Sequence, residues 1–175
     1  DLGQIRSNTP YPTALDRPDF LEVFGSIYEH SEWVADAVYA EITPGMPTDL
    51  VAKIMASIVD AAGTDSQLTL LRAHPDLAGR LSLAELTDAS REEQTGAGLD
   101  QCTPEELAEF QTLNHEYLAR FEFPFIFAVK GFHRTDILEA FRVRVNHTRE
   151  EEFKMALAQV HRIARLRLEA IADAH

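Results

Sequence analysis

Apolar residues recur at intervals of three and four along most of this chain, the spacing that places side chains on one face of an α-helix. The pattern is clear over residues 48–62, where Leu50, Ile54 and Ile58 share a face and Gly63 follows the last turn. Because this period covers most of the sequence, it predicts an all-α fold. We expect a single-domain helical bundle of about eight helices, counting short ones.

Two helix starts are marked by capping boxes, in which an N-cap hydroxyl and a carboxylate three residues later bind each other's backbone N–H groups. Thr103 stands in this relation to Glu106, and Pro104 occupies the first helical position. Thr148 has the same relation to Glu151. We therefore expect helices to begin after both threonines, the second of them running almost to the C-terminus.

One apolar run departs from the helical period. Residues 121–129, within the sequence FEFPFIFAVKG, are nearly all apolar and contain Pro124. The composition suits a strand, but no second convincing strand is present to pair its backbone donors. We therefore expect this run to form a buried extended segment or a helix end.

Length and composition favour one folded core. The chain has 175 residues and is 45% hydrophobic, which is enough to enclose a single substantial core. Residues 1–18 contain three prolines and little periodicity. We expect an irregular N-terminal arm over residues 1–18 and one domain over residues 19–175.

The charge of the chain argues against two classes of partner. Its formal charge of -13, from 29 acidic and 16 basic side chains, opposes phosphate backbones and anionic lipids, so we expect neither a nucleic acid nor a membrane as a partner. The single cysteine, Cys102, excludes an internal disulfide and fits a reducing compartment. The histidines show no metal-binding spacing, so we expect no metal.

The stretch AHPDLAG, residues 73–79, places an ionisable ring where a helical pattern stops. Pro75 disfavours helical geometry at His74 and Asp76 can cap the next element, so a helix end explains much of the stretch. It does not explain a histidine at a partly buried helix C-terminus, where the helix dipole and desolvation act on its charge in opposite directions. His74 is therefore a candidate acid or base near neutral pH.

The stretch SREEQTGAGLD, residues 90–100, offers three polar groups. Ser90 and Glu93 stand in capping-box register and glycines follow, so an ordinary short helix accounts for the spacing. On such a helix Ser90 and Glu93 share a face, and Gln94 diverges from Glu93 by about 100 degrees. A hydroxyl, a carboxylate and an amide placed in this way can bracket a small polar ligand.

Five stretches taken together resemble the 2-oxo-4-hydroxy-4-carboxy-5-ureidoimidazoline (OHCU) decarboxylase family, carboxy-lyases that act last on the route from urate to (S)-allantoin. They are FGSIYEHSEWVA, HPDLAG, SREEQTGAGLD, FEFPFIFAVKG and RIARLRL, in the family's order and at similar separations. The resemblance implies an all-α carbon–carbon lyase that acts on OHCU without a cofactor. It also suggests a homodimer.

The resemblance assigns roles to individual residues. The family's catalytic histidine falls on His74, and we expect Glu93 to act beside it by orienting the imidazole or by binding a ring nitrogen of the substrate. Glu122 stands where a glycine is common in the family. The positions implied to contact the substrate are Pro75, Ser90, Gln94, Phe123, Phe125, Ile126 and Phe127.

An anionic substrate needs a local cation in a chain of this charge. The last predicted helix carries Arg162, Arg165 and Arg167. Arginines on a long amphipathic helix usually face solvent, and Glu169 is spaced to pair with Arg165. We expect Arg162 to contact the substrate carboxylate, because it precedes Ile163 at the edge of the apolar face and the family has a substrate-contacting arginine in this region.

One alternative function comes from a different class. A non-catalytic helical module would bind a small polar, ureide-like ligand without turning it over. As for location, the sequence ends in IADAH, not in a peroxisomal tripeptide, and shows no basic-then-apolar leader. We therefore expect a cytoplasmic protein.

Overall fold

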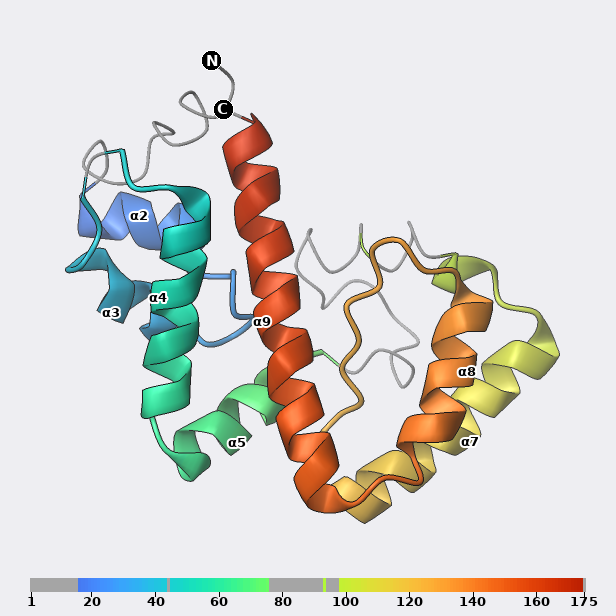
Figure 1. The fold of residues 1–175 in the computed structure, drawn as a ribbon. Helices are drawn as coiled ribbons and strands as arrows, with labels where there is room; N and C mark the ends of the chain where they lie inside the picture. Colours follow the sequence, from blue (N-terminus) through green and yellow to red (C-terminus); the bar gives the residue numbers. More distant parts are fainter. Residues whose placement is uncertain (1–15, 44, 76–92, 94–97, 175) are drawn as a thin grey trace. The chain divides into compact units, whose positions relative to one another are not determined.

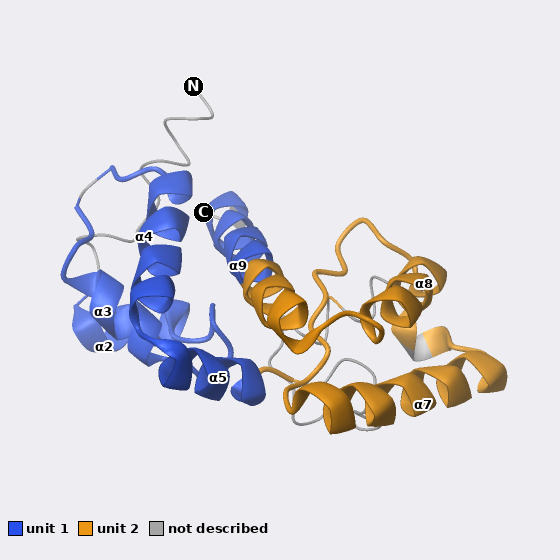
Figure 2. Cartoon of the chain, turned by 60° about the horizontal axis from the view of Figure 1, so that its bottom comes forward, with its two compact units in different colours: residues 1–73, 161–175 blue, residues 74–160 orange. Residues whose placement is uncertain are grey.

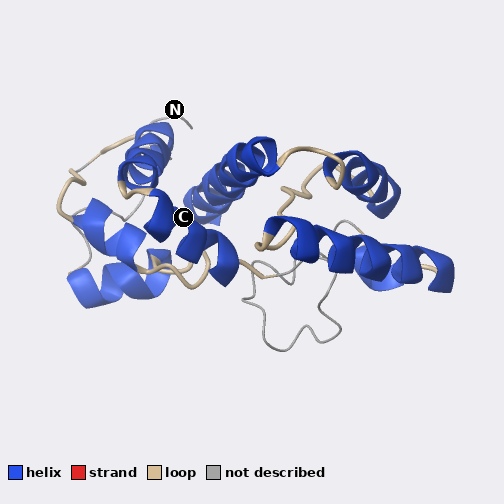
Figure 3. Ribbon diagram, turned by 90° about the horizontal axis from the view of Figure 1, so that it is seen from below, coloured by secondary structure: helices blue, strands red, loops and turns tan. Residues whose placement is uncertain are grey.

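The computed structural model describes residues 16–43, 45–75, 93 and 98–174. These ranges contain seven α-helices with described bounds, one short 3-10 helix and the single helical residue Glu93, and none of their residues lies in a strand (Figures 1 and 3). The predicted all-α fold is therefore confirmed. The elements are α2 (Arg17–Phe24), α3 (Trp33–Tyr39), α4 (Thr48–Ala61), α5 (Thr64–Ala73), η2 (Leu99–Gln101), α7 (Pro104–Phe121), α8 (Arg134–Arg144) and α9 (Arg149–Ala174).

Both predicted capping boxes are present. Thr103 Oγ1 accepts a hydrogen bond from Glu106 N at 3.1 Å, and Thr103 N donates to Glu106 Oε1 at 2.9 Å. Thr148 and Glu151 make the same pair of bonds ahead of α9, also at 3.1 and 2.9 Å. The pKa values of both glutamates are lowered, mainly because a backbone N–H donates to each carboxylate. These bonds satisfy donors that a helix start leaves unpaired.

Two helix ends differ slightly from the prediction. The N-cap of α2 is Asp16, whose Oδ1 accepts from Asp19 N at 3.0 Å, so the helix includes the last two residues of the predicted arm. Residues 1–15 of that arm lie outside the described residues. Helix α4 ends at Ala61, one residue early, and Gly63 then has a φ of 92°, in the left-handed region that favours glycine.

The chain divides into two compact units (Figure 2). Unit 1 comprises residues 1–73 and 161–175, and unit 2 comprises residues 74–160. Helix α9 is continuous and contributes its first part to unit 2 and its remainder to unit 1 (Figure 1). The predicted organisation as one domain over residues 19–175 stays a prediction.

Unit 1 is a helical assembly in which α3 packs against α2 and α4, and α4 packs against α5. Helix α5 is also fixed by a buried side chain, since Gln67 Nε2 donates to the carbonyl oxygens of Val59 and Asp60, both at 3.1 Å. These carbonyls belong to the last turn of α4, which leaves its carbonyls without partners inside the helix. Gln67 therefore ties the start of α5 to the end of α4.

Unit 2 is built around aromatic side chains. The Phe125 ring stacks on Phe141 of α8, with centroids 3.8 Å apart and planes 11° apart. The ring of Tyr117 on α7 meets both phenylalanines edge to face, at 5.4 and 5.8 Å. Residues 123–126 are all buried and lie outside any helix, as predicted for the apolar run.

Helix α7 ends in a left-handed residue that is not a glycine. Glu122 has φ 65° and ψ 22°, and its N–H donates to Leu118 O at 2.9 Å. Glycine is the residue that adopts this conformation without steric cost. This left-handed backbone geometry gives a physical reason why glycine is common at this position in the family that the sequence resembles.

Candidate active site

His74 follows directly on the end of a helix, as predicted. Helix α5 stops at Ala73, and Pro75 comes immediately after His74. His74 is half-buried and Pro75 is buried. A half-buried imidazole at a helix C-terminus experiences both the helix dipole and partial desolvation, which is the environment that the sequence predicted for an acid or base.

Only part of the stretch at residues 90–100 is described. Glu93 is helical and half-buried. Ser90 and Gln94 lie outside the described residues, so the proposed trio of hydroxyl, carboxylate and amide stays a prediction. His74, Glu93 and the segment 123–127 all belong to unit 2, whereas Arg162 belongs to unit 1.

The segment of residues 123–127, which contains four of the residues implied to contact the substrate, is held by side chains from α8 and α9. Arg144 Nη1 donates to the Ile126 carbonyl oxygen at 2.7 Å, and the Arg144 guanidinium lies 4.4 Å from the centroid of the Phe125 ring. Just beyond the segment, Ala128 N donates to Gln159 Oε1 at 2.8 Å. These contacts hold a non-helical stretch of backbone whose polar groups lack the regular pairing of a helix or sheet.

A buried carboxylate holds Arg144 in place. Glu152 is fully buried, and its Oε1 accepts from Arg144 Nε at 2.9 Å and from the Tyr117 hydroxyl at 2.5 Å. Its other oxygen, Oε2, lies 2.8 Å from His147 Nδ1. Burial raises the pKa of Tyr117, and donation to Glu152 raises it further. Tyr117 thus stays a neutral donor to a carboxylate that is paired with a buried guanidinium.

Neither Arg144 nor Glu152 was identified as a site residue from the sequence, although the sequence contains a signal. Arg144 follows Ile137 and Phe141 at helical spacing, on the face that those apolar residues bury. Charged side chains at such positions are buried only when they are paired. An arginine on an apolar stripe therefore indicates a partner, but its spacing does not say which one.

The three arginines of α9 differ in the groups with which they interact. Arg165 Nη2 donates to Asp49 of α4 at 2.7 Å, and its Nε reaches Glu169 at 3.4 Å, the pairing that the four-residue spacing indicated. Arg167 is buried, with Nη1 3.3 Å from the carbonyl oxygens of two residues between α2 and α3. Arg162 is exposed and forms no ion pair with any described residue.

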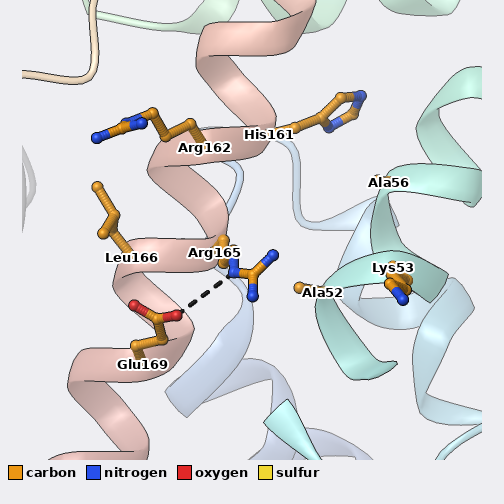
Figure 4. Close-up of a pocket in the computed structure, with 8 residues that line it drawn as sticks. All are labelled: Ala52, Lys53, Ala56, His161, Arg162, Arg165, Leu166 and Glu169. Carbon is orange, nitrogen blue, oxygen red and sulfur yellow. Dashed lines mark hydrogen bonds and ion pairs between the residues drawn. The ribbon is translucent and has the colours of Figure 1, made fainter. Parts of the chain in front are cut away.

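A groove of about 550 Å³ lies between α4 and α9 within unit 1 (Figure 4). Its α9 wall carries Arg165 and His161, and the His161 ring lies 3.0 Å from Asp60 and 2.8 Å from the Tyr28 hydroxyl. These polar groups already hold α9 to its neighbours. Arg162 borders the groove, but its guanidinium extends to the side of α9 away from α4 (Figure 4).

Two negative findings apply to the part of the chain that the structure describes. Its histidines, cysteine and carboxylates form no group of three that could hold a metal ion. None of its helices combines the length and apolar character needed to cross a membrane.

Comparisons with known proteins point to one family. A family model described as OHCU decarboxylase matches residues 13–169. Two curated proteins named 2-oxo-4-hydroxy-4-carboxy-5-ureidoimidazoline decarboxylase are each 44% identical to the chain. The one from Halalkalicoccus jeotgali aligns over 156 residues, 89% of this chain and 86% of that protein. The one from Haloferax volcanii aligns over 154 residues, 88% of this chain and 89% of that protein.

A solved structure supports the same relationship. The crystal structure of (S)-allantoin synthase matches with a TM-score of 0.71 and 34% sequence identity. The match covers 90% of this chain and 51% of that chain, so this chain spans about half of that protein.

Proposed function

We propose that this chain, which belongs to the OHCU decarboxylase family, removes carbon dioxide from OHCU and yields allantoin in the degradation of urate. The observation that carries this proposal is the likeness over almost the whole chain to proteins named for that reaction. The (S) configuration of the product is the finer part of the proposal. It is supported by the similarity to (S)-allantoin synthase.

The reaction requires the movement of an electron pair into the ring and the transfer of protons. The bond between the ring carbon and the carboxylate breaks, and its electron pair forms a double bond to the ring carbon that carries the ureido group. The electrons of the ring C=N bond move to the nitrogen, which takes up a proton. The resulting enol loses its hydroxyl proton to become a carbonyl, and a proton adds to the ring carbon that carries the ureido group. Addition on one face only sets the configuration of allantoin. We assign the handling of this proton to His74, with Glu93 orienting the imidazole or binding a ring nitrogen.

The segment 123–127 supplies the apolar wall of the proposed pocket. An apolar environment favours loss of the carboxylate, because the charge that is localised on the carboxylate becomes dispersed over the ring as neutral carbon dioxide leaves. Backbone groups near Phe125 and Phe127 would hold the ring amide and the ureido group. Pro75, Ser90 and Gln94 complete the proposed contacts.

Arg162 is the proposed partner of the substrate carboxylate. The chain carries a formal charge of -13, so its long-range field disfavours an anion and a local cation is needed. Of the three candidate arginines, Arg165 and Arg167 are engaged by other parts of unit 1, whereas Arg162 has no ion-pair partner among the described residues. That difference supports Arg162.

The decisive experiment supplies freshly generated OHCU and follows the optical activity of the product. We expect wild-type protein to consume OHCU faster than its spontaneous decay and to give one enantiomer. We expect His74→Ala to lose most of both effects. A His74→Ala variant that matched wild type in rate and enantiomeric purity would overturn the assignment of His74. Racemic allantoin formed by the wild-type protein at the spontaneous rate would instead favour the non-catalytic binding module.

Arg165 provides a matched control for Arg162. Losing one charge-assisted contact in the transition state costs about 1.5–3 kcal/mol, or roughly a 10- to 100-fold fall in kcat/KM. We expect that fall for Arg162→Ala and near-wild-type kcat/KM for Arg165→Ala. Equal, small losses in the two variants would mean that the carboxylate is held elsewhere.

Three further features are proposed, the first two of them on the resemblance alone. The protein is a homodimer, it needs no cofactor, and it is cytoplasmic. Light scattering of the purified protein tests the first. Activity retained after dialysis against a chelator tests the requirement for a metal, and fractionation of cells that contain the native chain tests the location.

A further inference from the structure

We infer that Arg144 and Gln159 are positioning residues. Arg144 binds a backbone group of Ile126, within the segment 123–127, and Gln159 binds one of Ala128, just beyond it, and together they fix the direction in which the other backbone groups of the segment face. This inference deepens the proposed function and rests on it, because the segment is the proposed wall of the substrate pocket. Neither side chain is assigned to touch the substrate. Their role is to orient a stretch of backbone that is proposed to contact the substrate.

The two contacts fall on residues two apart in the sequence. Arg144 donates to the carbonyl oxygen of Ile126 at 2.7 Å, and Gln159 accepts from the N–H of Ala128 at 2.8 Å. In an extended chain, the N–H and C=O groups of residues i and i+2 point to the same side, and those of the residue between them point to the other. The α8 and α9 side chains therefore occupy one edge of the segment.

The rings in the segment support this alternation. Phe125 and Phe127 are two residues apart, and their rings lie 6.2 Å apart with planes 23° apart, as expected for side chains on one face of an extended chain. The backbone groups of these two phenylalanines then face away from the edge that Arg144 and Gln159 hold. No backbone–backbone hydrogen bond involves either residue within the described part of the chain. Buried backbone groups need partners, and a bound ligand can supply them.

Arg144 is suited to this task because its own position is fixed on three sides. Glu152 accepts from Nε at 2.9 Å, the Phe125 ring lies under the guanidinium, and Nη1 remains for the Ile126 carbonyl. A planar guanidinium can make these contacts together, whereas a lysine ammonium is a single point of charge on a flexible stem. We therefore expect that in Arg144→Lys the backbone groups of the segment are no longer held in one orientation, although the substitution keeps the positive charge.

Gln159 offers a cleaner test, since it is half-buried and belongs to a separate helix from Arg144. Gln159→Met removes the acceptor for Ala128 N–H at similar volume, and Gln159→Glu restores an acceptor oxygen. Arg142→Lys is the control on α8: Arg142 pairs with Glu109 on α7, at 2.5 and 2.6 Å, and neither side chain forms a hydrogen bond with the described residues 123–127.

The experiment measures kcat, KM and the enantiomeric excess of allantoin for the four variants and for wild type. A misplacement of about 1 Å in a pocket can cost on the order of 100-fold in rate, so we expect Arg144→Lys to lose about 10- to 100-fold in kcat/KM and Gln159→Met about 10-fold. Both should lower enantiomeric excess. Gln159→Glu and Arg142→Lys should stay within about 3-fold of wild type and keep its enantiomeric purity.

Amide hydrogen exchange separates this inference from the proposed function. We expect the Ala128 amide to exchange faster in Gln159→Met than in wild type or in Gln159→Glu, with α7 amides unchanged, whether or not the protein has activity. An Ala128 amide that stayed equally protected in Gln159→Met would overturn the grip. Faster exchange with unchanged kcat/KM and enantiomeric excess would overturn the positioning role and leave the proposed function intact. Gln159→Met decides both points even if Arg144→Lys fails to fold.

Discussion

In the described part of the chain, each unit buries one arginine–glutamate pair, and the two pairs differ in the backbone that they hold. The Arg144 and Glu152 side chains of unit 2 are 6% and 0% exposed, and the Arg167 and Glu29 side chains of unit 1 are 5% and 0% exposed. Burial therefore does not distinguish them. Their nitrogen–oxygen separations do, at 2.9 Å in unit 2 and 3.8 Å in unit 1.

The surroundings of the two carboxylates explain the difference. Glu152 also accepts from the Tyr117 hydroxyl and lies beside the His147 ring. In unit 1, Arg167 Nη1 donates to two carbonyl oxygens of the turn after α2, both at 3.3 Å. Two equally buried pairs thus do different jobs, because one fixes a turn and the other fixes the proposed pocket wall. In this protein, the burial of a charged pair does not by itself indicate what the pair does.

The largest expected effect comes from breaking the unit 2 pair at its carboxylate. Glu152→Gln keeps the shape of the side chain but leaves the Arg144 guanidinium buried without a counter-charge. Removing one partner of a buried pair costs about 3–5 kcal/mol, and we expect that loss in the free energy of unfolding. Urea denaturation measures it. A loss below about 1 kcal/mol would show that the pair is dispensable to the fold.

Glu29→Gln makes the matching change in unit 1, and we expect a smaller loss of about 1–3 kcal/mol. The reason is that the pair is longer and Arg167 keeps its two carbonyl acceptors. The folded variant should also retain wild-type kcat/KM and enantiomeric excess, unlike Arg144→Lys. Equal losses of stability in Glu29→Gln and Glu152→Gln would remove the energetic side of the comparison.

Each unit also buries a tyrosine whose pKa is raised, chiefly by desolvation: Tyr28 in unit 1 and Tyr117 in unit 2. A raised folded pKa means that the stabilising contribution is fully present below the unfolded pKa of about 10 and is lost as pH rises toward the folded value. We expect wild-type stability to fall between pH 10 and 11.5, in a window set by that unfolded pKa of about 10.

Tyr28→Phe and Tyr117→Phe sharpen that test. Each variant should flatten the alkaline loss by up to about 1.4 kcal/mol per pH unit, because one proton no longer leaves on unfolding. Urea titrations at several pH values give the slope. A slope unchanged by either substitution would mean that the buried tyrosines ionise in the folded protein as they do in the unfolded chain.

The smallest expected effect concerns backbone strain. Among the residues that the structure describes, each unit has one left-handed residue other than glycine, His30 with φ 56° and Glu122 with φ 65°. Histidine tolerates this region better than glutamate, so we expect Glu122→Gly to stabilise the protein by about 0.5–1 kcal/mol and His30→Gly by less. Thermal unfolding measured in parallel decides the order. A destabilised Glu122→Gly variant would show that contacts of the Glu122 side chain outweigh the strain.

Local features of this protein were readable from its sequence. The helices follow from apolar residues at three- and four-residue spacing, and the two capping boxes follow from residues three apart, because all of these interactions lie within one or two turns. The helix end at His74 followed from the proline after it. The family was recognised from five collinear stretches, and the matched family model and relatives confirmed it.

Tertiary structure decided which distant side chains meet. Helical spacing placed Arg144 on an apolar face, but only the packing of α8, α9 and the segment 123–127 brought it to Glu152 and to the Ile126 carbonyl. The same holds for α9. Only the fold showed that Arg165 forms an ion pair with Asp49, and that Arg162 forms none with any described residue. Spacing along a helix fixes the face on which a residue lies, whereas its partner depends on which element packs against that face, and this is a property of the whole chain.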